Sequence, residues 1–367
     1  MSSRLHRRGF LRAAGAAALA PVLSPARAGS APGDWPPAEG PGTPRLCLGT
    51  GANADEREMR RIRQIGVDHV LMGGPKIPWT EEDLRSLVER FHKGGLTVAN
   101  LMIAGFPNAL YGRPGRDEEI EKATASIRAA GRAGIPVVEY NFYAHRLTEG
   151  YYEELGRAAA GLTAYDYERS KDLPPLPEVG THGLEAMWAN VAYVLKAVVP
   201  AAESAGVRLA LHPNDPPVPR SRGSAQIMAT LEGWKRLVMI VDSPANGITY
   251  DCGVTREMGE DPVAVCRWFG ERDRVNHVHY RNVRVRRPYV DYTEVVLDEG
   301  QVDMFGVMRE LVRQKYPRAL YPEHPRALDA DRETPGFNPY YPGGGGYAGL
   351  VYNVAYTKAM LQAALRG

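Results

Sequence analysis

The sequence predicts a single α/β domain in which eight parallel strands and their helices form a closed (β/α)8 barrel. From Arg45 onward, short apolar runs alternate with amphipathic segments, and this alternation repeats eight times. The chain has 367 residues, 44% of them hydrophobic, which is enough for one barrel with a large core. Polar side chains also gather at the ends of successive strands, which meet at one mouth in such a barrel.

The strand–helix units can be assigned in chain order. The expected strands are Arg45–Gly49, Asp68–Met72, Thr97–Ile103, Val137–Phe142, Arg208–His212, Ile248–Cys252, Val275–Tyr280 and Ala319–Glu323. The clearest helical patterns are Glu81–Lys93, Glu118–Ala133, Gly183–Ala205 and Met304–Gln314. The alternative is an open doubly wound sheet. No Gly-x-Gly-x-x-Gly motif follows an early strand, which weakens a dinucleotide-binding version of that sheet.

Two long insertions interrupt this rhythm. Residues 143–182 follow the fourth strand and contain several tyrosines. Residues 283–301 follow the seventh strand and contain Arg284, Arg286, Arg287, Tyr289 and Tyr292. Both insertions come after the carboxyl end of a strand, where the loops of a barrel build its active site. The alternative is that they are surface loops without a function.

The first 28 residues are expected to be a signal peptide. Arg7 and Arg8 form a twin-arginine pair in the segment HRRGFLR, an alanine-rich stretch follows, and Ala26-Arg27-Ala28 offers a signal-peptidase site. These features resemble a Tat signal, although a basic tail without a targeting role is the alternative. The sequence thus predicts export to the periplasm or the exterior, a Pro- and Gly-rich linker over residues 29–43, and the barrel over residues 44–367.

Charge and cysteine content limit the possible partners. Cleavage after residue 28 removes five arginines and no acidic residue, so the net charge falls from +2 to −3. A slightly acidic mature chain argues against binding to nucleic acid or to an anionic membrane surface, and the alanine-rich stretch is too short to serve as a membrane anchor. The three cysteines, Cys47, Cys252 and Cys266, form no spaced motif and cannot make a complete disulfide framework. A homo-oligomer is left open.

Four consecutive strands end in groups that can bind a metal ion. The candidates, one from each of the fifth to eighth strands, are His212, Asp251, His279 and Glu323. A lone histidine at a strand end is more often a hydrogen-bonded core residue, but four such groups on consecutive strands favour a shared site. A mixed set of nitrogen and oxygen ligands suits Mn²⁺, Fe²⁺, Zn²⁺ or Co²⁺ better than Mg²⁺ or Ca²⁺.

Neighbouring residues leave some choices open. Asp251 and Cys252 face opposite ways in a regular strand, so only one of them should face the metal. Glu323 and His324 could both enter the site if the strand ends at Glu323. His277 lies deeper in its strand, and we interpret it as a core residue or an outer partner of the site.

The residues around these groups resemble the mannonate dehydratase family of the xylose-isomerase-like superfamily. The matching stretches are Tyr140-Asn141-Phe142, Gly206–Pro217 with Leu211-His212-Pro213-Asn214-Asp215, Val241–Thr249, His279–Val283 and Val302-Asp303-Met304. Together these motifs are specific, and the resemblance covers most of residues 44–367.

The resemblance implies a metal-dependent dehydration of D-mannonate to 2-keto-3-deoxygluconate, with Mn²⁺ or Fe²⁺ as the cofactor. The family's ligands are a His, a Cys, a second His and an Asp; His212 and His279 match the histidines, and Glu323 stands in the place of the Asp. His324 matches the catalytic histidine. Asn338-Pro339-Tyr340-Tyr341 resembles the family's Asn-Pro-Gly-Tyr and implies that Tyr341 is the catalytic tyrosine.

The sequence also departs from the family pattern. Ungapped matching puts the family's cysteine ligand at Asp251, with Cys252 as the alternative after a shift of one residue. An Asp in place of a Cys would favour the harder ion Mn²⁺. The family's Trp-Thr-Arg is absent, because residues 145–148 read His-Arg-Leu-Thr, and residues 291–294 replace its Phe-His-Glu. The metal ligands are thus better preserved than the substrate-binding residues.

We expect a sugar or sugar acid as the substrate. Arg281 could hold its carboxylate in a bidentate bond, with a salt bridge at the rim as the alternative, and Asn141 and Asn214 are further substrate-binding candidates. His324 and Tyr341 would transfer the protons of a dehydration. A metal-dependent sugar isomerase or epimerase on the same barrel is the runner-up. A non-catalytic periplasmic carbohydrate-binding protein is a third possibility, which the set of metal-binding side chains argues against.

Overall fold

The computed structural model describes residues 35–367. The predicted signal peptide and the first part of the predicted linker lie outside these residues. Residues 35–44 contain no helix or strand, and the regular structure begins at Arg45. The chain divides into the units 1–38 and 39–367, and the second of these contains the barrel.

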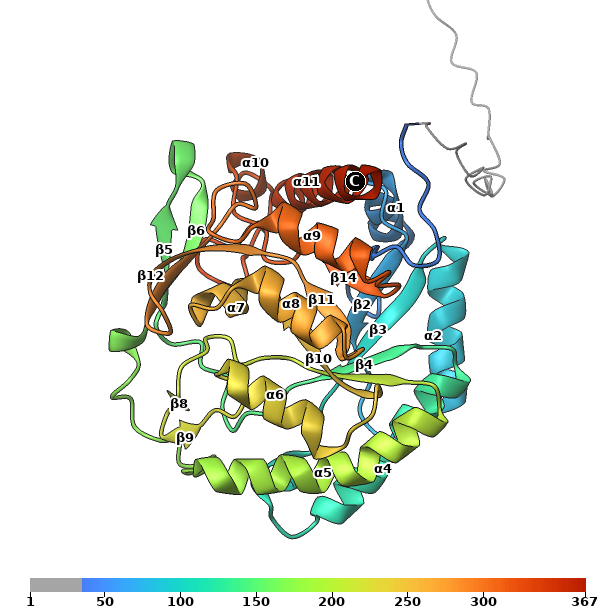
Figure 1. The fold of residues 1–367 in the computed structure, drawn as a ribbon, viewed down its shortest axis with the longest axis vertical. Coiled ribbons are helices and arrows are strands. Elements are labelled where there is room, and N and C mark those ends of the chain that lie inside the picture. The colour runs from blue at the N-terminus through green and yellow to red at the C-terminus, as the bar shows by residue number, and fades with distance from the viewer. Residues whose placement is uncertain (1–34) are drawn as a thin grey trace, which may run out of the picture. The chain divides into compact units, whose positions relative to one another are not determined.

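Eight parallel strands close into the predicted barrel (Figure 1). In the order in which they neighbour one another, they are β1 (Arg45–Gly49), β14 (Ala319–Tyr321), β11 (Val275–His279), β10 (Asn246–Asp251), β7 (Arg208–Leu211), β4 (Val137–Tyr140), β3 (Thr97–Ile103) and β2 (His69–Gly73). The expected (β/α)8 fold class is therefore confirmed, and the open doubly wound sheet is excluded.

Helices follow the strands and pack around the barrel (Figure 1). The longer ones are α1 (Glu56–Gln64), α2 (Glu81–Lys93), α4 (Arg116–Arg132), α5 (Leu184–Ser204), α6 (Leu231–Ile240), α8 (Pro262–Gly270), α9 (Met304–Arg313) and α11 (Tyr347–Arg366). The short ones are α3 (Pro107–Tyr111), α7 (Cys252–Glu257), α10 (Asp329–Arg332), η1 (Arg157–Ala159) and η2 (Tyr167–Arg169). Within residues 35–367, no helix combines the length and the apolar character needed to span a bilayer.

Local sequence explains where the helices begin and end. In α2, the side chain of Thr80 accepts a hydrogen bond from the backbone N–H of Asp83 at 3.1 Å and caps the amino end. Acidic residues occupy its first turn and basic residues its last turn, as the helix dipole favours. Its apolar side chains Leu84 and Phe91 are fully buried against the barrel.

Several predicted strands are longer than the observed ones at their carboxyl ends. Asn141, His212, Tyr280 and Glu323 were predicted inside strands but lie just beyond them. The sixth strand ends at Asp251, because its carboxylate caps α7 by accepting from the backbone N–H of Val254 at 2.8 Å. Of the four metal-binding candidates, His212 and Glu323 therefore lie beyond their strands, whereas Asp251 and His279 are the last residues of theirs.

The two long insertions contain more structure than the sequence suggested. Each contributes two strands to one antiparallel sheet, which we call the insert sheet. Its strands are β5 (Tyr151–Leu155), β6 (Gly161–Asp166), β12 (Asn282–Arg287) and β13 (Asp291–Val295), in the order β12-β13-β6-β5. A two-stranded ribbon of β8 (Arg220–Ser221) and β9 (Ser224–Ala225) lies in the loop after β7.

Candidate metal centre and active site

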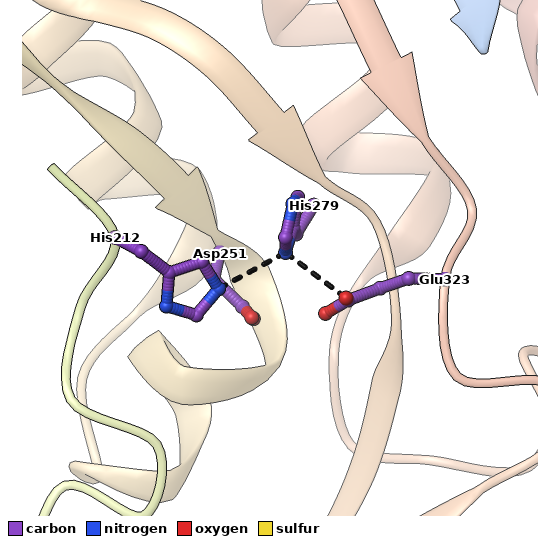
Figure 2. Close-up of side chains that lie close together, drawn as sticks. All are labelled: His212, Asp251, His279 and Glu323. Carbon is purple, nitrogen blue, oxygen red and sulfur yellow. Dashed lines mark hydrogen bonds and ion pairs between the residues drawn. The ribbon is translucent and has the colours of Figure 1, made fainter. Parts of the chain in front are cut away.

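Four side chains from consecutive strands meet at the barrel mouth (Figure 2). His212 directly follows β7, Asp251 ends β10, His279 ends β11, and Glu323 lies two residues beyond β14. Asp251 and His279 are partners in the register of β10 and β11, which puts them at the same height. One potential ligand atom from each of the four lies within 4.8 Å of the others. The structure thus brings together the four residues predicted to bind a metal.

The two imidazoles present nitrogen atoms to the same point. His212 Nε2 lies 3.1 Å from His279 Nδ1, while His212 Nδ1 lies 2.7 Å from the carbonyl oxygen of Pro213. That carbonyl can only accept, so the neutral His212 ring carries its proton on Nδ1 and turns the lone pair of Nε2 toward His279. Burial by itself lowers the pKa of His279, but Glu323 and Glu139 outweigh it and raise the pKa to about 9. The space between the rings therefore favours a positive charge, which a metal ion could supply.

The two carboxylates complete this set of donors. Glu323 Oε2 lies 3.0 Å from His279 Nδ1, and its side chain is 6% exposed. Asp251 is fully buried, and this burial, together with the repulsion of Glu323, raises the pKa of its carboxyl despite the opposing effect of Arg281. Two imidazole nitrogens and two carboxylates, from one half-buried and three buried residues, are a donor set that fits a divalent ion such as Mn²⁺, Fe²⁺, Zn²⁺ or Co²⁺.

Cys252 lies outside this cluster. It is the first residue of α7, and its buried thiol donates a hydrogen bond to the carbonyl oxygen of Arg281 at 3.2 Å. Burial raises the pKa of this thiol well above its ordinary value. The pairing of β10 with β11 is irregular between Ile248 and Thr249, yet Asp251 is the residue that faces the cluster. The geometry favours Asp251 as the ligand, and its binding to a metal stays a prediction.

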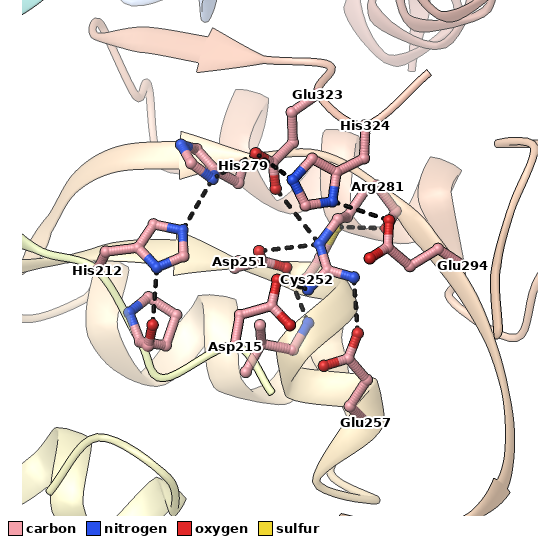
Figure 3. A network of polar contacts seen from close by, with 12 residues as sticks. His212, Asp215, Asp251, Cys252, Glu257, His279, Arg281, Glu294, Glu323 and His324 are labelled. Carbon is pink, nitrogen blue, oxygen red and sulfur yellow. Dashed lines mark hydrogen bonds and ion pairs between the residues drawn. The ribbon is translucent and has the colours of Figure 1, made fainter. Parts of the chain in front are cut away.

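Arg281 lies among carboxylates (Figure 3). Its Nε is 3.0 Å from Asp251 and 3.3 Å from Glu323, its Nη1 is 2.6 Å from Glu257, and its Nη2 is 3.2 Å from Asp215. The residue is 1% exposed. A substrate carboxylate would have to share or displace these partners. The contacts favour the salt-bridge alternative, in which Arg281 holds Asp251 and Glu323 in place, and a role in substrate binding stays a prediction.

His324 lies beside the cluster and is oriented by Glu294 of β13. Its Nδ1 is 2.8 Å from the Glu294 carboxylate, and its Nε2 is 3.4 Å from Glu323. The backbone of His324 has φ 44°, in the left-handed region that is uncommon for residues other than glycine. Burial favours the neutral imidazole, but Glu294 and Glu323 outweigh it and raise the pKa of His324. Its side chain remains 18% exposed, so a bound molecule can reach it.

Tyr341 is the next residue outward from the metal cluster. Its ring centroid lies 5.6 Å from that of His324 and 5.2 Å from that of Tyr151 in the insert sheet. The Arg146 guanidinium donates a hydrogen bond to its phenol oxygen, and a second one, at 3.1 Å, to that of Tyr340. The structure thus places both predicted catalytic residues side by side at the mouth.

The two asparagines predicted to bind substrate have partners other than the four metal-binding candidates. Asn214 is 2% exposed, and its side-chain oxygen accepts from the backbone N–H of Met228 at 2.8 Å. Asn141 is half-buried, and its amide lies 3.7 Å from the sulfur of Met102. Within residues 35–367, no hydrogen bond connects either side chain to the four metal-binding candidates. Asn214 has a structural contact in its loop, and a role for either in substrate binding stays a prediction.

Sequence reasoning missed several residues of this site. Glu294, Asp215 and Glu257 orient His324 or Arg281, and Asp215 also accepts hydrogen bonds from Tyr151 at 2.9 Å and Tyr292 at 3.3 Å. Glu294 stands directly before the apolar run Val295-Val296-Leu297, which could have marked it as buried, whereas the segments around Asp215 and Glu257 carry no such signal. The sequence could not have indicated the partners of these residues, which come from distant parts of the chain.

The structure is a closed parallel barrel whose strand ends carry a cluster of His, Asp, His and Glu side chains that could hold a metal ion. One solved structure with this fold is a xylose isomerase-like TIM barrel protein from Mycobacterium smegmatis, in complex with magnesium. It covers 88% of this chain and 98% of its own, with a TM-score of 0.56 and 14% identity. At that identity, the likeness shows the fold alone.

The closer similarities all point to one family. The family described as D-mannonate dehydratase (UxuA) matches residues 178–365. A mannonate dehydratase from Streptococcus pneumoniae (strain 70585) is 33% identical over 291 residues, which cover 71% of this chain and 79% of that protein. The crystal structure of mannonate dehydratase from Streptococcus suis serotype 2 has a TM-score of 0.78 and 26% identity, covering 88% of this chain and 95% of its own. This chain belongs to the D-mannonate dehydratase family.

Proposed function

We propose that this protein is a metal-dependent hydro-lyase that converts D-mannonate, or a related aldonate, to the corresponding 2-keto-3-deoxy acid. The observation that carries the proposal is the cluster of His212, Asp251, His279 and Glu323, with His324 and Tyr341 beside it. Family membership supports the same reaction. The reaction removes a proton from C2 and hydroxide from C3. It therefore needs a base that takes the C2 proton and an acid that protonates the departing hydroxyl.

The proposed cofactor is Mn²⁺ or Fe²⁺, held by the four clustered residues. When bound, the ion would act as a Lewis acid that stabilises negative charge on the substrate next to its carboxylate. The buried carboxylates of Asp251 and Glu323 are hard oxygen ligands, which supports Mn²⁺ over the softer ions. Arg281 offsets part of their negative charge and fixes their positions through its contacts with both.

His324 is proposed to take the C2 proton. Glu294 accepts from its Nδ1, so the lone pair of a neutral ring is on Nε2, the nitrogen on the side of the metal cluster. Since Glu294 stabilises the imidazolium that forms, it makes His324 a stronger base. The electron pair left at C2 then forms the double bond to C3 as the C3–O bond breaks.

Tyr341 is proposed to protonate the departing hydroxyl, which leaves as water. Burial raises the pKa of Tyr341 far above neutral pH, so the phenol keeps its proton until a stronger base appears. Its oxygen already accepts from Arg146, and the same contact would stabilise the phenolate left after the transfer. The enol product then becomes the 2-keto acid by taking up a proton at C3.

Tyr341→Phe should therefore lower kcat by about 10²–10⁴-fold, the usual contribution of a positioned acid or base. Its metal content should not change, because Tyr341 lies beyond His324. Tyr340→Phe is the matched control, since Tyr340 is 76% exposed and also accepts from Arg146 but does not contact His324. Steady-state kinetics on the active aldonate measures both variants. Equal losses in the two would contradict the role of Tyr341.

The reaction itself is tested by incubating the Mn²⁺-loaded protein with a panel of aldonates and ketoses. Mass spectrometry should find the loss of one water molecule from an aldonate and no reaction with neutral ketoses. An unchanged mass with a new sugar stereoisomer would mark an isomerase or epimerase. Metal binding without turnover of any compound would favour a carbohydrate-binding protein.

We also propose that the protein is exported by the Tat pathway, which carries folded proteins. Arg7 and Arg8, on which the proposal rests, lie outside the residues that the structure describes. Replacing both with lysine should keep the protein in the cytoplasm and leave the mature sequence unchanged. Fractionation of cells expressing either form, with an unrelated Tat substrate as the control, measures this. Normal export of the double variant would refute the assignment.

A further inference from the structure

We infer that Glu139 is a positioning residue that orients His279 for metal binding from inside the barrel. Glu139 is the third residue of β4, and its side chain points into the barrel below the metal cluster, where one carboxylate oxygen, one nitrogen of His277 and one of His279 lie within 4.8 Å of one another. The inference rests on the proposed metal centre, but it does not depend on which sugar acid reacts.

The carboxylate of Glu139 is held in a fixed position. The side chain is 1% exposed, its Oε2 accepts a hydrogen bond from Asn100 at 2.7 Å, and its Oε1 accepts one from Thr249 at 2.8 Å. These partners come from β3 and β10, the strands on either side of the β4–β7 pair. Burying a carboxylate in a barrel core costs free energy, and three strands contribute to holding this one in place.

Glu139 lies behind the ring of His279. Its Oε1 is 3.6 Å from His279 Nε2, a nitrogen that has no hydrogen-bond partner among the described residues. The other ring nitrogen, Nδ1, faces His212 at 3.1 Å and Glu323 at 3.0 Å. Without an ion, Nδ1 donates to these two acceptors. When an ion takes the place of that proton, the negative charge of Glu139 favours a proton on Nε2 and would leave the lone pair of Nδ1 for the ion.

This arrangement parallels that of His212 on the opposite side. There the backbone carbonyl of Pro213 accepts from Nδ1 and leaves Nε2 for the cluster. For both histidines, an oxygen atom on the far side of the ring favours one tautomer, and metal-binding histidines usually have such an oxygen. The Pro213 carbonyl acts by a hydrogen bond at 2.7 Å, whereas the Glu139 carboxylate acts by its charge at 3.6 Å, and that charge also increases the basicity of the ring nitrogen that would bind the metal.

The competing explanation is that Glu139 only neutralises buried histidines. His277 allows the two to be separated, because its ring lies 5.1 Å from that of His279, it is fully buried, and both of its nitrogens lack a partner in the described residues. His277 belongs to the same buried group but does not face the four-residue cluster. Substitution of His277 should therefore disturb the core without changing the orientation of His279.

The test is the affinity of the purified protein for Mn²⁺, measured by competition with a chelating dye. Glu139→Gln keeps the shape but removes the charge, and it should weaken Mn²⁺ binding by about 10–100-fold, the usual effect of losing an outer partner of a metal ligand. His277→Gln is the matched control and should bind Mn²⁺ within a few-fold of the unaltered protein. Circular dichroism in the absence of metal verifies that both variants are folded.

A folded Glu139→Gln variant with unaltered Mn²⁺ affinity would overturn the inference, and so would an equal loss in the His277→Gln variant. If Glu139→Gln does not fold, the Mn²⁺ affinity of the Thr249→Val variant tests the inference instead. It removes one hydrogen bond to Glu139 without touching a metal ligand, and it should reduce the affinity by a smaller factor. Unchanged affinity of that variant would then overturn the inference. A protein that binds Mn²⁺ as described but dehydrates no aldonate would refute the proposed reaction and leave the role of Glu139 standing.

Discussion

His212→Ala and His279→Ala are each expected to abolish tight binding of a divalent ion, and dehydration with it. Each substitution removes one of the two imidazole nitrogens that meet at 3.1 Å, and His279→Ala also leaves the buried Glu323 carboxylate without its imidazole partner. Affinity should fall by more than about 100-fold, since even the loss of an outer partner costs about 10–100-fold. Metal content by atomic spectroscopy after dialysis measures the effect.

His92→Ala is the control for this pair. His92 is an exposed residue in the last turn of α2 and is far in the sequence from all four candidate ligands. Its variant should hold as much metal as the unaltered protein. Full metal occupancy in the His212→Ala/His279→Ala double variant would contradict the assignment of the metal centre.

The second large effect that we expect distinguishes Asp251 from its neighbour Cys252 as the metal ligand. Asp251→Ala should weaken metal binding severely, because Asp251 supplies a carboxylate to the cluster and is itself held by Arg281 at 3.0 Å. Cys252→Ser should leave metal binding nearly intact, because its thiol is bonded to a backbone carbonyl instead. Equilibrium dialysis with Mn²⁺ compares the two variants.

Asp251→Asn is a useful companion, since Asp251 also caps α7 and its loss can destabilise that helix. The amide keeps an oxygen for the cap and removes the charge, so this variant should fold normally and still bind metal weakly. Alkylation supplies an independent measure, because a thiolate ligand is protected by bound metal. If metal shields Cys252 from iodoacetamide and Asp251→Ala still binds it tightly, the cysteine is the ligand after all.

The barrel could be predicted from the sequence because each of its units is a local pattern. Three predicted elements, Arg45–Gly49, Glu81–Lys93 and Thr97–Ile103, agree with the structure residue for residue. The carboxyl ends of the strands were predicted less accurately, because the polar residues that follow a strand happen to continue its pattern of alternating apolar and polar residues. At Asp251 the decisive event is the capping of α7, a contact that a strand pattern does not reveal.

The candidate metal ligands could also be predicted, because parallel strands deliver their carboxyl ends to one mouth. The roles of the surrounding residues could not. Nothing in the local sequence of Arg281 indicates that the carboxylates of Asp215, Glu257 and Asp251 surround its guanidinium. The insert sheet could not be predicted for the same reason, since its strands pair over a long sequence distance: Tyr292 pairs with Tyr165, more than a hundred residues away.

The most direct test of the account is a proton NMR time course of D-mannonate in D₂O with the Mn²⁺-loaded mature protein. The account predicts that the C2 proton signal disappears as a 2-keto-3-deoxy acid forms with one deuterium at C3, and that a chelator stops the reaction. The base would remove the C2 proton, and the enol would take its new C3 proton from solvent. Exchange of the C2 proton without formation of the keto acid would contradict dehydration, and turnover that persists after complete removal of metal would contradict the metal centre.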